Sequence, residues 1–202
     1  MTDRTPIDFY FDFASPYGYI ASTRIDELAA RHGRRVAWRP ILLGVVFKTT
    51  GMGPLPSIPM KGAYSLRDFA RSARLYGVPF AMPKAFPFNA VVPSRAFYWL
   101  QARDPDLARR FAQAAYRAAF PEQTDITTPD ACAAIAANLG VKREETLAAL
   151  NDQAVKDRLR AEVDQAIARG VFGSPFIVVD GEPFWGADRL DHVERWLKTG
   201  GW

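Results

Sequence analysis

Residues 11–22, FDFASPYGYIAS, run from a predicted strand directly into a predicted helix. Ser15 stands at the junction and Pro16 follows it, the favoured pairing of an N-cap residue with a proline at the first helical position. Redox proteins with this kind of junction usually carry a Cys-x-x-Cys pair there. Cys132 is the single cysteine of the chain, so that pair and an intramolecular disulfide are both excluded. Chemistry at this helix start therefore depends on a serine.

The residues around the junction predict a strand–helix–strand unit. Residues 7–13 alternate in the period of a strand, in which every second side chain faces the same side. A helix is predicted over residues 16–32, and Gly33 just beyond it fits a helix C-cap. Residues 35–39 alternate again and predict a second strand.

The last part of the chain predicts a strand hairpin followed by a helix. Residues 176–179, FIVV, are apolar and rich in β-branched side chains, which is typical of a buried strand. Asp180-Gly181 is a strong hairpin-turn signal, and residues 183–185 supply the partner strand. A final helix is predicted to begin at residue 187 or 188.

Helices fill the middle of the chain. A loop rich in proline and glycine is predicted over residues 51–62. The helical patterns that follow cover residues 65–76, 94–102, 106–120, 129–139, 143–150 and 154–169. The whole order predicts an α/β fold: a thioredoxin-like domain (β-α-β…β-β-α) with a large all-helical insertion. We assign residues 1–43 and 170–202 to the thioredoxin-like domain and residues 44–169 to the insertion.

Composition and charge narrow the class of protein. The net charge of +4 and the pI near 9.3 favour an anionic small ligand. Basic runs such as Arg34-Arg35 are short and interleaved with acids, which argues against a nucleic-acid surface. The sequence shows neither a signal-peptide pattern nor an apolar run long enough to span a membrane, so we expect a cytoplasmic protein without a membrane partner. The two histidines and one cysteine lack metal-ligand spacing, and no metal site is expected.

Two Ser-Pro pairs are the candidate chemical features. At Ser15, the free amides and the dipole of a helix N-terminus stabilise an anion, and the hydroxyl can donate a hydrogen bond to a bound thiolate. The alternative is that Ser15 only caps the helix. Ser174-Pro175 precedes the third strand, where thioredoxin-like folds hold a cis-proline and the residue before it pairs its backbone with an extended peptide ligand. The alternative is an ordinary trans turn.

Several stretches together carry a family resemblance. They are DFYFDFASPYGYIA, RPILLGVVFKTTG, LYGVPF, GVFGSPFIVV and FWGADRL, spread over residues 8–190. The chain resembles the 2-hydroxychromene-2-carboxylate isomerases and the kappa-class glutathione transferases, which are thioredoxin-like proteins related to the DsbA oxidoreductases. The first strand is more similar to that of the bacterial isomerases than to that of the animal transferases.

The resemblance implies a glutathione site. Ser15 would donate a hydrogen bond to the sulfur, and Ser174, before Pro175, would pair its backbone with the cysteinyl part. The γ-glutamyl end would be held by Trp185, Gly186, Ala187 and Asp188. A carboxylate such as that of Asp188 suits an α-ammonium group; the alternative is that it caps the last helix, and both roles are compatible. The family also implies a homodimer.

The same resemblance implies a substrate with an anionic aromatic carboxylate. Lys48 and Lys61 fall where the family has basic residues facing the ligands, although each lysine fits a solvated loop equally well. Asn89 is a possible polar group in the same cleft. After TTG the family commonly has asparagine, whereas this chain has Met52. The physiological substrate therefore need not be the chromene.

These features predict a glutathione-dependent cis-trans isomerase of the 2-hydroxychromene-2-carboxylate type. Ser15 would stabilise a thiolate that adds to a conjugated, aryl-pyruvate-like substrate and then leaves it. A kappa-like glutathione transferase is the first alternative. The second is a module that binds glutathione without turnover, which Met52 favours. Cys132, in an alanine-rich helix, is predicted to be a core residue.

Overall fold

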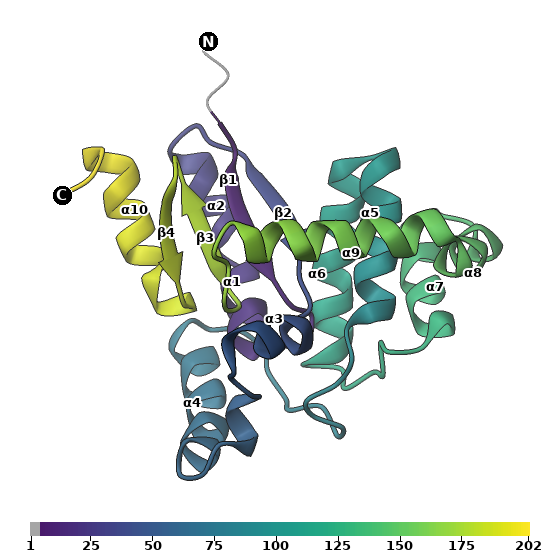
Figure 1. Cartoon of the computed structure of the whole chain (residues 1–202), viewed down its shortest axis with the longest axis horizontal. Helices are drawn as coiled ribbons and strands as arrows, with labels where there is room; N and C mark the ends of the chain where they lie inside the picture. The colour runs from purple at the N-terminus through teal and green to yellow at the C-terminus, as the bar shows by residue number, and fades with distance from the viewer. Residues whose placement is uncertain (1–4) are drawn as a thin grey trace.

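A four-stranded mixed sheet forms the centre of the computed structural model, which describes residues 5–202 (Figure 1). The strands lie in the order β2-β1-β3-β4. Their bounds are β1 Ile7–Phe11, β2 Val36–Pro40, β3 Phe176–Val179 and β4 Glu182–Trp185. β1 runs parallel to β2 and antiparallel to β3, and β4 pairs antiparallel with β3. The predicted order along the chain, two strands before the helical insertion and two after it, is confirmed.

Helices lie between β1 and β2, between β2 and β3, and after β4. They are α1 Pro16–Ser22, α2 Ile25–Arg31, α3 Leu43–Thr50, α4 Lys61–Leu75, α5 Val91–Arg103, α6 Pro105–Ala119, α7 Pro129–Ala137, α8 Arg143–Asn151, α9 Gln153–Ala168 and α10 Leu190–Thr199. Two short 3₁₀ helices, η1 Leu55–Ser57 and η2 Ala187–Arg189, complete the set within residues 5–202. In Figure 1, α5–α8 form a block on one side of the sheet, α10 lies by β4, and α4 extends away from the rest.

The helix predicted over residues 16–32 is in fact two helices, α1 and α2. The break follows a local competition for backbone carbonyls: the Ser22 hydroxyl donates to the Tyr19 carbonyl, and the Thr23 hydroxyl donates to the Ile20 carbonyl at 2.8 Å. Thr23 then serves as the C-cap of α1, and α2 begins at Ile25.

Helix α3 was not predicted from the sequence. Its β-branched residues have low intrinsic helix propensity, which hides the helical pattern. Tertiary packing overrides that propensity because Val46 is buried in a cluster with Tyr10 of β1 and Phe176 of β3. Gly51, with φ of 70°, ends the helix in the left-handed conformation that glycine adopts without strain.

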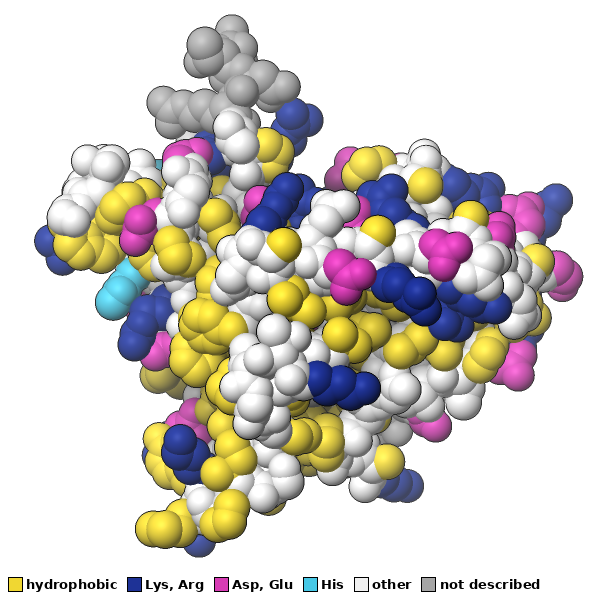
Figure 2. Space-filling model, viewed as in Figure 1, with side chains coloured by type: hydrophobic (Ala, Val, Ile, Leu, Met, Phe, Trp, Pro, Cys, Tyr) yellow, Lys and Arg dark blue, Asp and Glu magenta, His cyan; other side chains and the backbone are white. Residues whose placement is uncertain are grey.

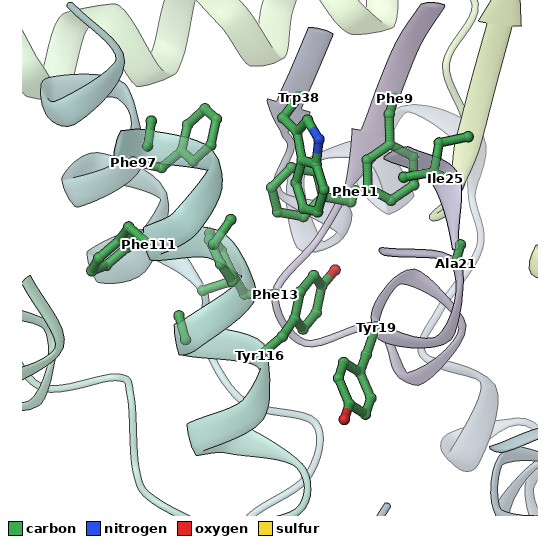
Figure 3. Packing of buried hydrophobic residues seen from close by; sticks show 14 of the residues in the cluster. Phe9, Phe11, Phe13, Tyr19, Ala21, Ile25, Trp38, Phe97, Phe111 and Tyr116 are labelled. Carbon is green, nitrogen blue, oxygen red and sulfur yellow. The ribbon is translucent and has the colours of Figure 1, made fainter. Parts of the chain in front are cut away.

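Both faces of the sheet are covered. On one face, Phe9 and Phe11 pack with Trp38 and with Tyr116 of α6, as Figure 3 shows. On the other face, Tyr10 is buried under α3 and α9. Burial of each large apolar side chain contributes about 1.5–3 kcal/mol, so the double cover makes β1 the centre of the core.

Cys132 lies in α7 and is fully buried, as predicted. Its thiol donates to the Ile126 carbonyl at 3.3 Å, and burial raises its pKa to about 12. Such a thiol stays protonated and unreactive at neutral pH. No helix within residues 5–202 is long and apolar enough to cross a membrane. Nor do three or more potential metal ligands come together in that part of the chain.

Candidate active site

Ser15 lies between β1 and α1 and caps the helix. Its backbone is extended, and its Oγ accepts the Gly18 amide at 3.0 Å, while Pro16 occupies the first turn. The same Oγ donates to the Ser174 carbonyl at 2.9 Å, and the Ser174–Pro175 peptide bond is cis. Both serines are buried. The two Ser-Pro pairs that the sequence singled out therefore meet. We call the buried polar surface around Ser15 and Ser174, at the start of α1, the floor.

Asp12 belongs to the same floor, although sequence reasoning missed it. Its two carboxylate oxygens accept the amides of Ala14 and Leu43, each at 2.7 Å. Burial raises its pKa from 3.8 to about 6, and the two amide bonds oppose that rise in part. β1 ends at Phe11, and Asp12, the next residue, is buried. An acidic residue three positions before the predicted N-cap was the available signal.

The floor leaves no space for a side chain at Gly18. A Cβ there would lie 2.6 Å from Tyr116 Oη and 2.9 Å from Ser174 Oγ. Such separations are shorter than atomic contacts permit, so α1 could keep its place against these hydroxyls only with glycine at this position. Sequence reasoning missed both Gly18 and Tyr116, because neither one belongs to a local pattern.

A cavity of about 1040 Å³ opens above this floor. Of the site residues predicted from the sequence, all but Pro175 line it: Ser15, Lys48, Lys61, Asn89, Ser174, Trp185, Gly186, Ala187 and Asp188. Pro175 lies directly behind Ser174, and its carbonyl accepts the Gly186 amide at 3.1 Å. The structure thus brings residues from both ends and the middle of the chain to one cavity.

One side of the cavity is formed by the end of β4 and by η2. Trp185 is half-exposed, and its ring packs edge-on against Phe172 at 5.0 Å. Asp188 does not cap α10, since the N-cap of that helix is Arg189 and no side chain bonds there. The capping alternative is therefore wrong. The exposed Asp188 carboxylate instead accepts a hydrogen bond from its neighbour Arg189 at 2.9 Å.

The opposite side is formed by α3, η1 and α4, and we call it the outer wall. Lys48 of α3 and Lys61 of α4 are exposed, and neither forms an ion pair with another residue in the range 5–202. Met52 is 44% exposed. Asn89 is engaged in part, because its Oδ1 accepts the Val91 amide at 2.9 Å at the start of α5. Only its amide nitrogen remains for a ligand.

Aromatic side chains join the floor to the outer wall. The Tyr17 ring packs edge-on against Phe69 of α4 at 4.9 Å, and its hydroxyl donates to Asp68 of the same helix. Burial and the Asp68 carboxylate raise the Tyr17 pKa, so the hydroxyl remains a donor. Other aromatic residues lining the cavity are Phe47, Tyr76, Phe86, Phe88 and Phe172. Figure 2 shows hydrophobic side chains gathered over this part of the molecule.

Comparisons with known proteins agree with this geometry. The profile of the DsbA-like thioredoxin domain matches residues 6–198. A 2-hydroxychromene-2-carboxylate isomerase of Sphingobium xenophagum is 33% identical over 196 residues, which cover 95% of this chain and 97% of the relative. A kappa 2 glutathione S-transferase of Caenorhabditis elegans is 30% identical over 210 residues, covering 98% of this chain and 93% of the relative.

A solved structure gives the same result. A 2-hydroxychromene-2-carboxylate isomerase superposes with a TM-score of 0.85 at 29% identity, covering 96% of this chain and 95% of the other. These matches confirm the predicted resemblance and the thioredoxin-like fold with its helical insertion. The chain therefore belongs to the DsbA-like thioredoxin family, and it is an enzyme of the group formed by the 2-hydroxychromene-2-carboxylate isomerases and the kappa-class glutathione transferases.

Proposed function

We propose that the protein is a glutathione-dependent cis-trans isomerase of anionic, aryl-pyruvate-like substrates, of the 2-hydroxychromene-2-carboxylate type. The observation that carries the proposal is the bond between the Ser15 hydroxyl and the Ser174 carbonyl at the N-terminus of α1. When bound, glutathione supplies a thiolate that adds to the conjugated double bond, allows rotation about the resulting single bond, and leaves again.

The floor fits a cysteinyl thiol. A backbone N–H from an extended ligand can bond to the Ser174 carbonyl, which otherwise accepts from the Ser15 hydroxyl. The Ser15 hydroxyl is then free to turn and donate to the sulfur. The α1 amides and dipole lie beside the same point and favour a negative charge. Each unit by which they lower the thiol pKa corresponds to about 1.4 kcal/mol.

The side of the cavity formed by residues 185–188 fits the γ-glutamyl end. Asp188 is exposed there, and its only ion pair within the described residues is with Arg189 next to it. That carboxylate can accept hydrogen bonds from an α-ammonium group. Gly186 and Ala187 line the cavity beside it.

The outer wall fits an anionic aromatic substrate. The amines of Lys48 and Lys61 have no carboxylate partner of their own in residues 5–202, so both remain available for the carboxylate of a ligand. The aromatic side chains around Phe69 offer ring faces and edges for an aryl group. Met52 adds an apolar contact where the family commonly has asparagine, so the substrate at this position carries fewer polar groups.

A stoichiometric assay separates the isomerase from its alternatives. Turnover of 2-hydroxychromene-2-carboxylate is measured with glutathione well below the substrate concentration, and free thiol is measured afterwards. Many turnovers with undiminished thiol support the isomerase. Thiol consumed one for one with product would instead identify a kappa-like transferase. Stoichiometric glutathione binding without turnover on aryl pyruvates or electrophiles would identify a binding module, the reading that Met52 favours.

The Ser15→Ala variant tests the role assigned to the floor. We expect the free energy of unfolding to fall by about 1 kcal/mol, the cost of a lost N-cap. We expect the pKa of bound glutathione to rise, measured from thiolate absorbance at 240 nm. An unchanged pKa would reduce Ser15 to a helix cap.

Two further features belong to the proposal. A cytoplasmic location suits it, because thiols are kept reduced there. A homodimer is the expected assembly, and the molecular mass in solution from sedimentation analysis tests it.

A further inference from the structure

Asp12 is the most connected residue of the floor, yet the proposed chemistry gives it no role. Its main-chain and side-chain atoms take part in five hydrogen bonds: its amide donates to Ser174 Oγ at 2.9 Å, its carbonyl accepts the Ser15 amide at 2.8 Å and Tyr116 Oη at 2.9 Å, and its carboxylate accepts the amides of Ala14 and Leu43. All three of its polar groups are therefore bonded around the point where Ser15 and Ser174 meet.

The carboxylate links two parts of the cavity that are separate in the sequence. Ala14 directly precedes Ser15, while Leu43 is the first residue of α3 in the outer wall. The N-cap position of α3 is Leu42, whose side chain can form no capping hydrogen bond. Asp12 therefore satisfies an amide at the start of α3 that the helix's own N-cap residue leaves open.

We propose that Asp12 is a positioning residue that caps α3 from the β1–α1 loop and so fixes the outer wall, with Lys48, relative to Ser15. This inference rests on the proposed function, because the wall and the floor hold the two reactants. The link itself can be tested without any ligand. The Asp12 carboxylate holds both the β1–α1 loop and the start of α3, so without it the loop and the helix are no longer connected.

The protonation state of Asp12 decides whether both bonds exist. A carboxylate offers two acceptor oxygens, whereas a protonated carboxyl directs its O–H away from one of the amide donors. With a pKa of about 6, the ionised form predominates at pH 7.5 and the protonated form at pH 5. The link between floor and outer wall is thus complete at neutral pH and weakened in acid.

The pH dependence of the link between floor and outer wall comes from Asp12 itself and not from the neighbouring titratable groups. The causes of its pKa shift are burial and two backbone amides, with no charged side chain among them. Tyr116 of α6 senses the Asp12 charge, but burial and that charge raise the Tyr116 pKa well above 10, so it stays neutral. Lys48 of α3 and Lys61 and Asp68 of α4 line that side of the cavity, and none of them is among the causes of the Asp12 shift.

Hydrogen exchange of the unliganded protein tests the inference. Amides of residues 43–50 are followed at pH 5 and pH 7.5, with the intrinsic pH dependence of exchange removed. We expect the wild-type helix to be at least fivefold better protected at pH 7.5. In Asp12→Asn, whose amide can accept from only one donor, we expect low protection at both pH values.

A matched control is Asp104→Asn. Asp104 caps α6 by accepting the Asp106 amide at 2.8 Å, does not line the cavity, and should leave α3 exchange unchanged. Equal α3 protection in wild type and Asp12→Asn would overturn the inference. If Asp12→Asn fails to fold, wild-type α3 protection that does not change between pH 5 and pH 7.5 overturns it by itself.

Glutathione binding provides the functional readout. In the wild type we expect the KM for an anionic substrate to rise as the pH falls below 6, because protonation of Asp12 weakens the link to α3. In Asp12→Asn we expect the KM to be at least fivefold higher than in the wild type at neutral pH and to show no such pH dependence. A wild-type protein that binds no glutathione would contradict the proposed function and leave the exchange result to decide the role of Asp12. Normal binding with a KM and pH profile equal to wild type would contradict the positioning role alone.

Discussion

Ser15 and Lys61 face the same cavity from surroundings that differ in every physical respect. Ser15 is 5% exposed and bonded to two backbone groups, and the floor around it is buried. Lys61 lies in the outer wall beside Met60, which is 93% exposed, and forms no ion pair with any other described residue. The floor is fixed before a ligand arrives, whereas the exposed side chain of Lys61 is free to adapt to one.

The contrast separates the chemistry of the site from its specificity. The amides at the N-terminus of α1 are in place before charge develops, and the Ser15 hydroxyl has only to turn toward the sulfur, so the floor suits the proposed thiolate. Exposed amines and aromatic rings contribute to affinity through charge and area, so the outer wall suits selection among substrates. Changes in the floor should therefore lower turnover for every substrate. Changes in the outer wall should alter KM in a substrate-dependent way.

The largest effect is expected at Gly18. In Gly18→Ala the added carbon meets Tyr116 Oη and Ser174 Oγ, so α1 must move and the Ser15–Ser174 bond is broken. We expect turnover to fall at least 100-fold and the free energy of unfolding to fall by about 1–3 kcal/mol. Steady-state kinetics and denaturant titration measure both.

Gly44→Ala is the matched control for Gly18. Gly44 also lines the cavity, but a Cβ there meets nothing within 4 Å. Alanine in α3 should stabilise the protein by about 0.5–1 kcal/mol and leave turnover within a few-fold. Equal losses in the two variants would mean that the floor is no more rigid than the outer wall.

The next largest effect is on stability: the buried carboxylate of Asp12 should make the free energy of unfolding depend on pH. Burial raises the Asp12 pKa from 3.8 to about 6, so the folded state binds this proton more tightly than the unfolded state. Measured against the unfolded chain, in which Asp12 is solvated, its contribution to stability is full below pH 4 and is lost as pH rises through 6. Opening of α3 alone, with Asp12 still buried, follows the two carboxylate–amide bonds instead and is opposed most at neutral pH. Relative to Asp12→Asn, the wild type should lose about 2 kcal/mol of unfolding free energy between pH 4.5 and pH 7.5. Parallel denaturant titrations of the two proteins measure it, and a constant difference would contradict the raised pKa.

A smaller effect is expected in the outer wall. In Lys61→Met the substrate loses one cationic partner, so KM for an anionic substrate should rise about tenfold with little change in kcat. The pKa of bound glutathione should stay the same, because the floor is intact. Lys156→Met, on α9 outside the cavity, is the control and should change neither quantity. A large fall in kcat with unchanged KM would place Lys61 with the floor.

The smallest effect is expected at Cys132, which belongs to neither region. Cys132→Ala should keep turnover within threefold, since a buried thiol with a pKa of about 12 is not reactive. The cost in stability should be about 1 kcal/mol for the small cavity left behind. A folded variant without turnover would contradict this.

The same division explains what the sequence could predict. The Ser15-Pro16 helix start and the strand after Pro175 follow local rules of capping and alternation, so the strand order and half of the floor were predictable. Asp12 and Tyr116 were not predictable because their roles depend on partners as far as 162 positions away in the chain. Helix α3 was not predictable because the packing of Val46, rather than local helix propensity, stabilises it. The positions of Lys48 and Lys61 came from family resemblance, since an exposed lysine leaves no local pattern.

The bond between Ser15 and Ser174 spans 159 positions, which determines when the site can form during biosynthesis. β1 emerges from the ribosome first, but it must wait for its antiparallel partner: Phe9 pairs with Ile177. Contacts this distant in the chain form slowly, because a long loop has to close before they gain any energy. A nascent chain that lacks residues 174–202 holds every helix from α1 to α9 but only one half of the floor. The proposed glutathione site is therefore completed at the end of synthesis, when the last hairpin docks against β1.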